Sequence, residues 1–132
     1  MTPHEYQVLA EKTESKPHEA LLQRLMRSDE TPRLVHASMG LQTEAGEFTD
    51  ALKKYVYYGK ELDRVNLGEE IGDILWYCAL ACNALGIDMG AVMEKNIAKL
   101  QARYPDKFTE EAALVRHLEV ERSILEGEEP CP

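Results

Sequence analysis

The chain has 132 residues, the length of one ordinary domain, and this is enough to bury a hydrophobic core without disulfide bonds. Hydrophobic residues make up 44% of the sequence and charged residues 30%, a composition that excludes a disordered chain. Acidic residues outnumber basic ones by 24 to 15, and the net charge is −9. This charge argues against nucleic acid as a partner, because nucleic-acid-binding domains neutralise phosphates with lysine and arginine.

Hydrophobic runs and cysteines indicate the compartment. The longest apolar run, 74–85, is too short to cross a bilayer, and residues 1–10 contain no apolar signal segment. The cysteines are odd in number, and Cys78 and Cys82 lie four apart in an apolar helical run, a pattern that favours free thiols over a disulfide bond. We therefore expect a cytoplasmic protein without a membrane partner.

Capping residues and hydrophobic spacing predict helices along the whole chain, with no alternating strand pattern longer than four residues. Thr2-Pro3-His4-Glu5 is a capping box for the first helix, and Thr31-Pro32 begins a long third helix. Asn66-Leu67-Gly68-Glu69 is interpreted as the capping box of the fourth helix, Asp88 as the cap of the fifth and Thr109 as the cap of the last. The expected helices span about 3–12, 17–27, 31–57, 66–85, 88–103 and 109–126.

These elements predict an all-α helical bundle forming a single domain over residues 1–132. Its core is expected at about 32–108, followed by a C-terminal helix at about 110–126 and a short acidic tail at 127–132. The short loop between the third and fourth helices predicts that they are antiparallel neighbours. The fourth helix is apolar on nearly every side after Asp73, so we expect it to be covered by the bundle and by a second subunit.

Two pairs of carboxylates stand out on the third and fourth helices. Glu44 and Glu47 are three residues apart, as are Glu70 and Asp73, so each pair projects from one face of its helix. Antiparallel helices would bring the two pairs face to face, where their charges repel strongly unless a cation lies between them. Oxygen ligands favour Mg²⁺, Mn²⁺ or Ca²⁺ over Zn²⁺. The spacing therefore predicts a divalent metal site.

Several alternatives remain at this stage. A single Glu-x-x-Glu pair is usually a solvated helix face, and Glu69 competes with Glu70 as a ligand although its position suits helix capping. Asp50 extends the acidic face and is a candidate further ligand. Gly46 and Gly72, which lie between the acids, predict that the two helices approach closely there.

Basic and aromatic residues near this face have two interpretations each. Asn96, Lys99 and Arg103 form a stripe on the fifth helix that would either hold phosphates or remain an ordinary solvated face. Lys54, one heptad after Glu47, would either bind phosphate or remain solvated. His36 would either be an ordinary surface histidine or contact a nucleotide. Trp76 would either belong to the core or an interface or stack on a base.

The ordered set of motifs resembles a known family. Glu44-x-x-Glu47, a gap of 22 residues, Glu70-x-x-Asp73, and then Asn96, Lys99 and Arg103-Tyr104-Pro105 are similar to the MazG-like members of the all-α nucleoside triphosphate pyrophosphohydrolases. The resemblance covers residues 40–108. It implies a helical homodimer or homotetramer that uses Mg²⁺, with Mn²⁺ as a substitute, to hydrolyse nucleoside triphosphates to the monophosphate and pyrophosphate.

The resemblance also implies roles for individual residues. Many relatives have a further glutamate where this chain has Thr43, so the proton acceptor here is expected to be a ligand carboxylate, Glu47 or Glu44. A non-catalytic metal- and nucleotide-binding oligomer and a phosphohydrolase that releases orthophosphate remain the alternatives, and base specificity, sugar specificity and metal number stay open. The metal ligands implied are Glu44, Glu47, Glu70 and Asp73, and the substrate-binding residues are Tyr77, Asn96, Lys99 and Arg103.

Overall fold

The computed structural model describes residues 1–14 and 19–127, and this part of the chain is built from helices without a strand. The predicted all-α class is therefore confirmed. Pro17 and His18, at the predicted start of the second helix, and Cys131 lie outside the described residues. The helices are α1 (Pro3–Thr13), α2 (Glu19–Leu25), α3 (Glu30–Tyr58), α4 (Arg64–Leu85), α5 (Met89–Arg103), α6 (Glu110–Leu114) and α7 (Leu118–Glu126).

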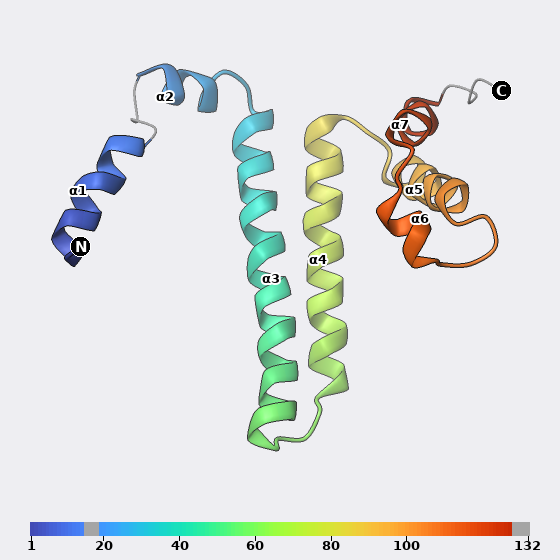
Figure 1. Cartoon of the computed structure of the whole chain (residues 1–132), viewed down its shortest axis with the longest axis horizontal. Coiled ribbons are helices and arrows are strands. Elements are labelled where there is room, and N and C mark those ends of the chain that lie inside the picture. Colours follow the sequence, from blue (N-terminus) through green and yellow to red (C-terminus); the bar gives the residue numbers. More distant parts are fainter. Residues whose placement is uncertain (15–18, 128–132) are drawn as a thin grey trace.

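The centre of the molecule is the hairpin formed by α3 and α4, the two longest helices. They run antiparallel and pack along their length (Figure 1), as the short connection predicts. Gly59 ends α3 in the left-handed conformation with φ of 65°, which a residue without a Cβ adopts at little cost. The chain then turns through 59–63 into α4, and this turn fixes which face of each helix meets the other.

The caps of α1, α5 and α6 agree with the sequence, whereas the starts of α3 and α4 do not. Helix α3 begins at Glu30 after Asp29, one residue before the predicted Thr31-Pro32. Thr2, Asp88 and Thr109 each accept a hydrogen bond from a backbone N–H at the start of their helices. At α4 the cap is Asp63, whose carboxylate accepts from the N–H groups of Val65 and Asn66. The prediction that Asn66 caps this helix is wrong, because Asp63 occupies that role three residues earlier.

The close approach inside the hairpin lies at Gly40, not at the glycines between the acids. A Cβ at Gly40 would lie 2.1 Å from Cε1 of Tyr77, whereas a Cβ at Gly46 or Gly72 would meet nothing within 4 Å. The predicted contact at Gly46 and Gly72 is therefore wrong for this chain. The aromatic ring of Tyr77 fits against α3 because Gly40 has no side chain. This contact sets the distance between α3 and α4 one turn from Glu44.

The predicted single C-terminal helix is interrupted. Val115 ends α6 with an extended backbone, and α7 begins after His117. The break allows Arg116 to reach Glu121 on α7, and Arg103 on α5 contacts the same carboxylate. These ion pairs hold α6 and α7 onto α5, a unit that we call the C-terminal clip (residues 89–127).

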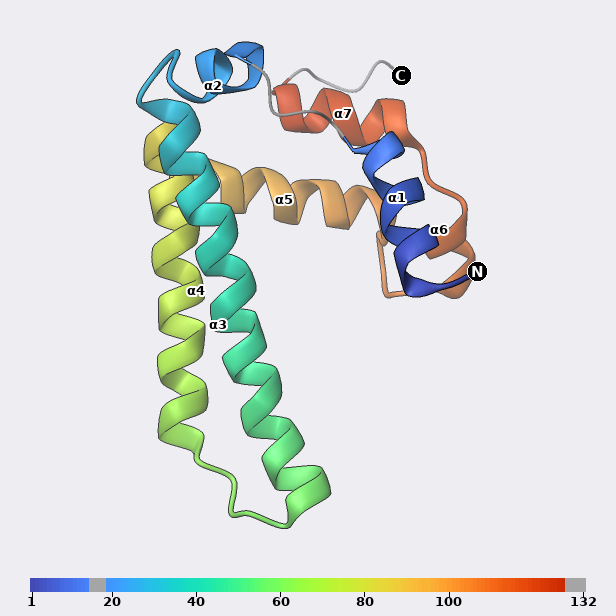
Figure 2. The same cartoon turned by 90° about the vertical axis from the view of Figure 1, so that its left-hand side faces the viewer.

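The chain is open rather than compact. Figures 1 and 2 show α2 at the start of α3, α1 well separated from the hairpin, and the C-terminal clip to one side of the end of α4. The accessible surface is 11061 Å², whereas a compact monomer of this length exposes about 7,000 Å². Among the described residues, Ala37 is the single hydrophobic residue that is fully buried. One chain alone therefore leaves much of its apolar surface in solvent.

In the described residues, no single helix has both the length and the apolar character needed to cross a membrane. Helices α4 and α5 pass that test only together, and the chain bends by 104° between them.

Candidate metal centre

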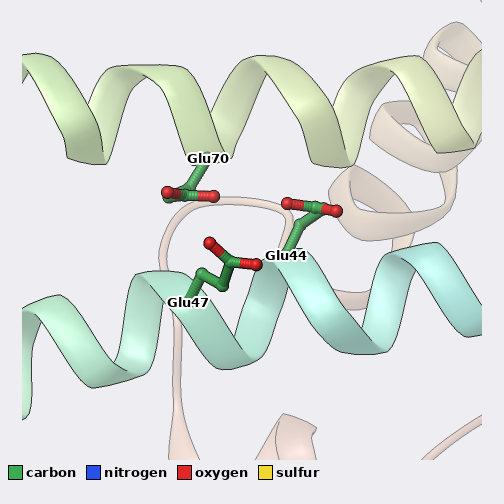
Figure 3. Close-up of side chains that lie close together, drawn as sticks. All are labelled: Glu44, Glu47 and Glu70. Carbon is green, nitrogen blue, oxygen red and sulfur yellow. The ribbon is translucent and has the colours of Figure 1, made fainter.

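Three glutamates meet between the two helices of the hairpin. Glu44 and Glu47 project from α3, and Glu70 projects toward them from α4 (Figure 3). One carboxylate oxygen from each lies within 4.8 Å of the others. The i, i+3 spacing places the first two on one face of α3, and the antiparallel register brings the third opposite.

The three carboxylates form no salt bridge with a lysine, arginine or histidine in residues 1–14 and 19–127. The pKa of Lys54 nearby is raised mainly by its hydrogen bond with Asp50, although the charge of Glu47 also contributes. Glu70 is only 4% exposed. The pKa of Glu44 is raised, mainly by burial and also by the charges of Glu47, Asp73 and Glu70, against the hydrogen bond from Thr43. Carboxylates held this close without a counter-charge are destabilising on their own.

The donor set fits a divalent metal. Hard cations such as Mg²⁺ and Mn²⁺ prefer carboxylate oxygens, and the three oxygens are close enough to share one ion. Bound metal would supply the missing positive charge at Glu44, Glu47 and Glu70. The fourth predicted ligand, Asp73, is exposed and lies outside the group of three, although its charge reaches Glu44.

Glu70 is held by a neutral neighbour. The side-chain amide of Asn66, one turn earlier on α4, donates a hydrogen bond from Nδ2 to Oε1 of Glu70 at 2.7 Å. In the described residues this is the one side-chain hydrogen bond that Glu70 accepts. This contact was not predicted, because the sequence around Asn66 matches a helix cap. The i, i+4 spacing to a metal-ligand candidate was the signal that could have found it.

An open cavity of about 320 Å³ adjoins the carboxylates at the loop end of the hairpin. Glu47 and Glu70 line it together with Lys54 and Lys60. Lys54 donates to Oδ2 of Asp50 at 2.6 Å, and this partner lowers the pKa of the Asp50 carboxyl. Asp50, the candidate further ligand, is therefore paired with a lysine, while Lys54 stands at the edge of a space next to the metal centre.

Aromatic side chains lie on the other side of the carboxylates. Tyr77 packs over Gly40 and makes edge-to-face contacts with Trp76 and His36, with ring centroids 4.9 Å and 5.6 Å apart. His36 is exposed, and the exposed fraction of Trp76 is 57%. The structure thus groups three aromatic rings about one turn from Glu44.

The predicted substrate-binding stripe on α5 is not near the carboxylates of its own chain. Glu70 lies fifteen residues before the end of α4, about 22 Å along the helix, and α5 then bends away (Figure 2). Asn96 is exposed and Lys99 half-buried. Arg103 pairs instead with Glu121 at 2.5 Å, a partner that the sequence analysis missed.

The match to a known family covers α3 from residue 36 onward, α4 and all of α5. Residues 36–108, just over half of the chain, match the MazG nucleotide pyrophosphohydrolase domain. The chain therefore belongs to this family, and the resemblance is confirmed. The Gene 37 protein of Mycobacterium phage L5 is 34% identical over 79 residues, which are 57% of this chain and 69% of that protein. No solved structure is significantly similar to the chain.

Proposed function

We propose that the protein is a Mg²⁺-dependent enzyme that hydrolyses nucleoside or deoxynucleoside triphosphates to the monophosphate and pyrophosphate, with a role in cleansing nucleotide pools. The observation that carries this proposal is the group of three carboxylates between α3 and α4, which forms no salt bridge within the described part of the chain and lies inside the family match. A purely structural hairpin would gain nothing from this repulsion.

The metal would be held by Glu44, Glu47 and Glu70, with Asp73 joining them after a change of side-chain rotamer. Mg²⁺, or Mn²⁺ in its place, would neutralise phosphate oxygens and lower the pKa of a bound water. These four carboxylates are the residues that the family resemblance assigns to metal binding. The proximity of Glu44, Glu47 and Glu70 and the burial of Glu70 support that assignment for three of the four.

The proton from the attacking water is assigned to a carboxylate of α3. Glu47 is exposed and lines the cavity, so a water in that space is within reach of it, and Glu44 stands one turn away. Thr43 does not suit this role, because a neutral hydroxyl is a far weaker base than a carboxylate; its hydrogen points toward the carbonyl of Gly40 and the carboxylate of Glu44. Hydrolysis at the α-phosphorus needs a positioned water and neutralised phosphates.

The substrate would extend to both sides of the carboxylates. On one side, Tyr77 and the rings beside it offer an aromatic surface that suits a nucleobase. On the other side, the ammonium group of Lys54 lies at the cavity and suits a phosphate. Asn96, Lys99 and Arg103 would contact the phosphates or the sugar from the α5 of a second copy, since α5 of the same chain bends away.

A homodimer or homotetramer is part of this proposal. The exposed surface exceeds that of a compact monomer by about 4,000 Å² per chain, which is well above the roughly 800 Å² that each partner buries in a standard interface. Trp76, Ile71 and Leu75 on α4 are each at least half exposed. A second copy of the chain would cover this apolar face and complete the site. A cytoplasmic location also stays a prediction, supported by the free thiols of Cys78 and Cys82.

The test is to incubate the purified protein with Mg²⁺ and a panel of canonical and modified nucleoside triphosphates, and to resolve the products by ion-exchange chromatography. Monophosphate and pyrophosphate, lost in Glu47→Gln, are the expected result. Diphosphate and orthophosphate would contradict the proposed reaction. Bound nucleotide without turnover would favour the non-catalytic alternative, a metal- and nucleotide-binding oligomer that acts as a sensor or interaction module.

A further inference from the structure

We propose that Asn66 is a positioning residue that orients Glu70 for metal binding. The inference rests on the proposed function, because it assumes that the carboxylates between α3 and α4 hold a divalent cation. It goes further by assigning a role to a residue outside the set of ligands.

The geometry of α4 leaves the Asn66 side chain available for this role. Asp63 caps the helix and binds the backbone N–H of Asn66, not its side chain. Asn66 and Glu70 are four residues apart and therefore lie on the same helix face. The side-chain amide nitrogen donates to Oε1 of Glu70 at 2.7 Å. An ionised carboxylate can only accept, so the amide nitrogen must be the atom that faces it.

The hydrogen bond fixes one oxygen of Glu70 and leaves the other free. Oε1 is engaged by Asn66, and no side-chain donor in the described residues bonds to Oε2. The carboxylate of Glu70 faces Glu44 and Glu47 (Figure 3). Both partners are at least partly buried, so the side chain of Glu70 has few other arrangements. The hydrogen bond thus holds the carboxylate of Glu70 at the place where the three carboxylates meet and leaves Oε2 without a side-chain donor in the described residues.

The neutrality of the donor is the important chemical point. A lysine or arginine at position 66 would orient Glu70 equally well, but its charge would compete with the metal. An amide orients the carboxylate and leaves its negative charge for the cation. Outer-shell donors of this kind typically change metal affinity by about 10- to 100-fold.

The experiment is a Mn²⁺ titration of the full chain followed by electron paramagnetic resonance, which reads metal binding without substrate. We expect Asn66→Ala to weaken Mn²⁺ binding by about 10- to 100-fold and Asn66→Gln, which keeps an amide donor, to restore most of the affinity. Alanine is a good helix former, so the melting temperature of the metal-free protein should stay near that of the wild type. Asn83→Ala, an exposed asparagine on the same helix, is the matched control.

Wild-type Mn²⁺ affinity in Asn66→Ala would overturn the inference, as would a lowered metal-free melting temperature with unchanged affinity, because that would make Asn66 merely structural. Failure of the wild-type protein to bind Mn²⁺ would overturn both this inference and the metal centre. Tight Mn²⁺ binding that depends on Asn66, without turnover of any nucleotide, would support the inference and contradict the proposed enzyme.

Discussion

The α3–α4 hairpin and the C-terminal clip each contain one buried glutamate, and the two glutamates have opposite kinds of hydrogen-bond partner. Glu70 is 4% exposed and accepts one side-chain hydrogen bond, from the neutral amide of Asn66. Glu121 is 6% exposed and accepts four, from the guanidinium groups of Arg103 and Arg116. Those two arginines lower the pKa of Glu121 to about 2.

This difference in partners distinguishes a carboxylate that stabilises the fold, Glu121, from one that is available to bind a ligand, Glu70. Burying a charge without a partner is destabilising, whereas a charge with two cationic partners can anchor a helix. Glu121 joins α5 to the segment after residue 108, where the family match ends. Glu70 faces two more carboxylates and has no such partner in the described part of the chain. The following predictions exploit this contrast.

Glu70→Gln is expected to have the largest effect on activity. The amide keeps the shape of the side chain but removes the ligand charge, so turnover should fall by more than about 100-fold, the upper end of outer-shell effects. The metal-free melting temperature should stay level or rise, because the repulsion from Glu44 and Glu47 is relieved. Pyrophosphate release and thermal melting by circular dichroism check both parts, and a folded variant with normal turnover would contradict the assignment.

Glu121→Gln is expected to lower the stability of the protein and to leave the metal centre of the hairpin intact. The substitution leaves the guanidinium groups of Arg103 and Arg116 without their charged partner, so the melting temperature should fall clearly. Mn²⁺ affinity at the hairpin should persist under conditions where the variant is folded. Glu119→Gln, an exposed position on α7, is the control. Equal stability of the two variants would show that the ion pairs contribute little.

Acid should act oppositely on the two glutamate sites. The pKa of Glu121 is about 2 in the folded protein against 4.5 as the reference, so its contribution to stability is complete above about pH 4.5 and is lost as the pH falls toward 2. The pKa of Glu44 is raised by burial and neighbouring charges, so its protonation on acidification relieves repulsion. Melting temperatures of the wild type and Glu121→Gln should therefore converge between pH 4.5 and 2.5. A constant difference would contradict the ion-pair account.

Gly40→Ala tests whether the hairpin is a rigid frame for the carboxylates. The new Cβ would lie 2.1 Å from the ring of Tyr77, and such overpacking typically costs about 1–3 kcal/mol of unfolding free energy. Gly46→Ala is the matched control, since its Cβ meets nothing within 4 Å and should stabilise α3 by about 0.5–1 kcal/mol. Denaturant unfolding measures both, and equal stabilities would show that the contact with Tyr77 does not restrain the helices.

Lys54→Ala should have the smallest effect. Its ion pair with Asp50 is solvent-exposed, so thermal stability should barely change. If the cavity holds substrate phosphates, KM should rise several-fold with kcat nearly unchanged. The control is Lys53→Ala, since Lys53 also contacts Asp50 but does not line the cavity in the described structure. An equal effect on KM from both variants would place the phosphates elsewhere.

The hairpin was largely predictable from the sequence because its determinants are local. Helix spacing, the short loop and the i, i+3 acids predict antiparallel helices with facing carboxylates, and Glu44, Glu47 and Glu70 do meet. The role of Asn66 was missed because Asn-x-x-Glu is also a capping pattern. Only the structure shows that Asp63 has already capped the helix.

The C-terminal clip was less predictable because its determinants are tertiary. The break between α6 and α7 contains no glycine or proline, the usual signals that end a helix. It is stabilised by contacts of Arg116 and Arg103 with Glu121 across the unit. The close approach at Gly40 was missed for a similar reason, since a glycine does not reveal which large side chain will pack against it. Here that side chain is Tyr77.

The most direct test of the central claim is the melting temperature of the metal-free wild type and Glu70→Gln as Mn²⁺ is added. A cation that binds only the folded state raises its stability with concentration. We predict that Mn²⁺ raises the melting temperature of the wild type progressively and leaves that of Glu70→Gln unchanged. The same rise in both proteins, or no rise in either, would contradict the claim that the uncompensated glutamates of the hairpin bind a divalent metal.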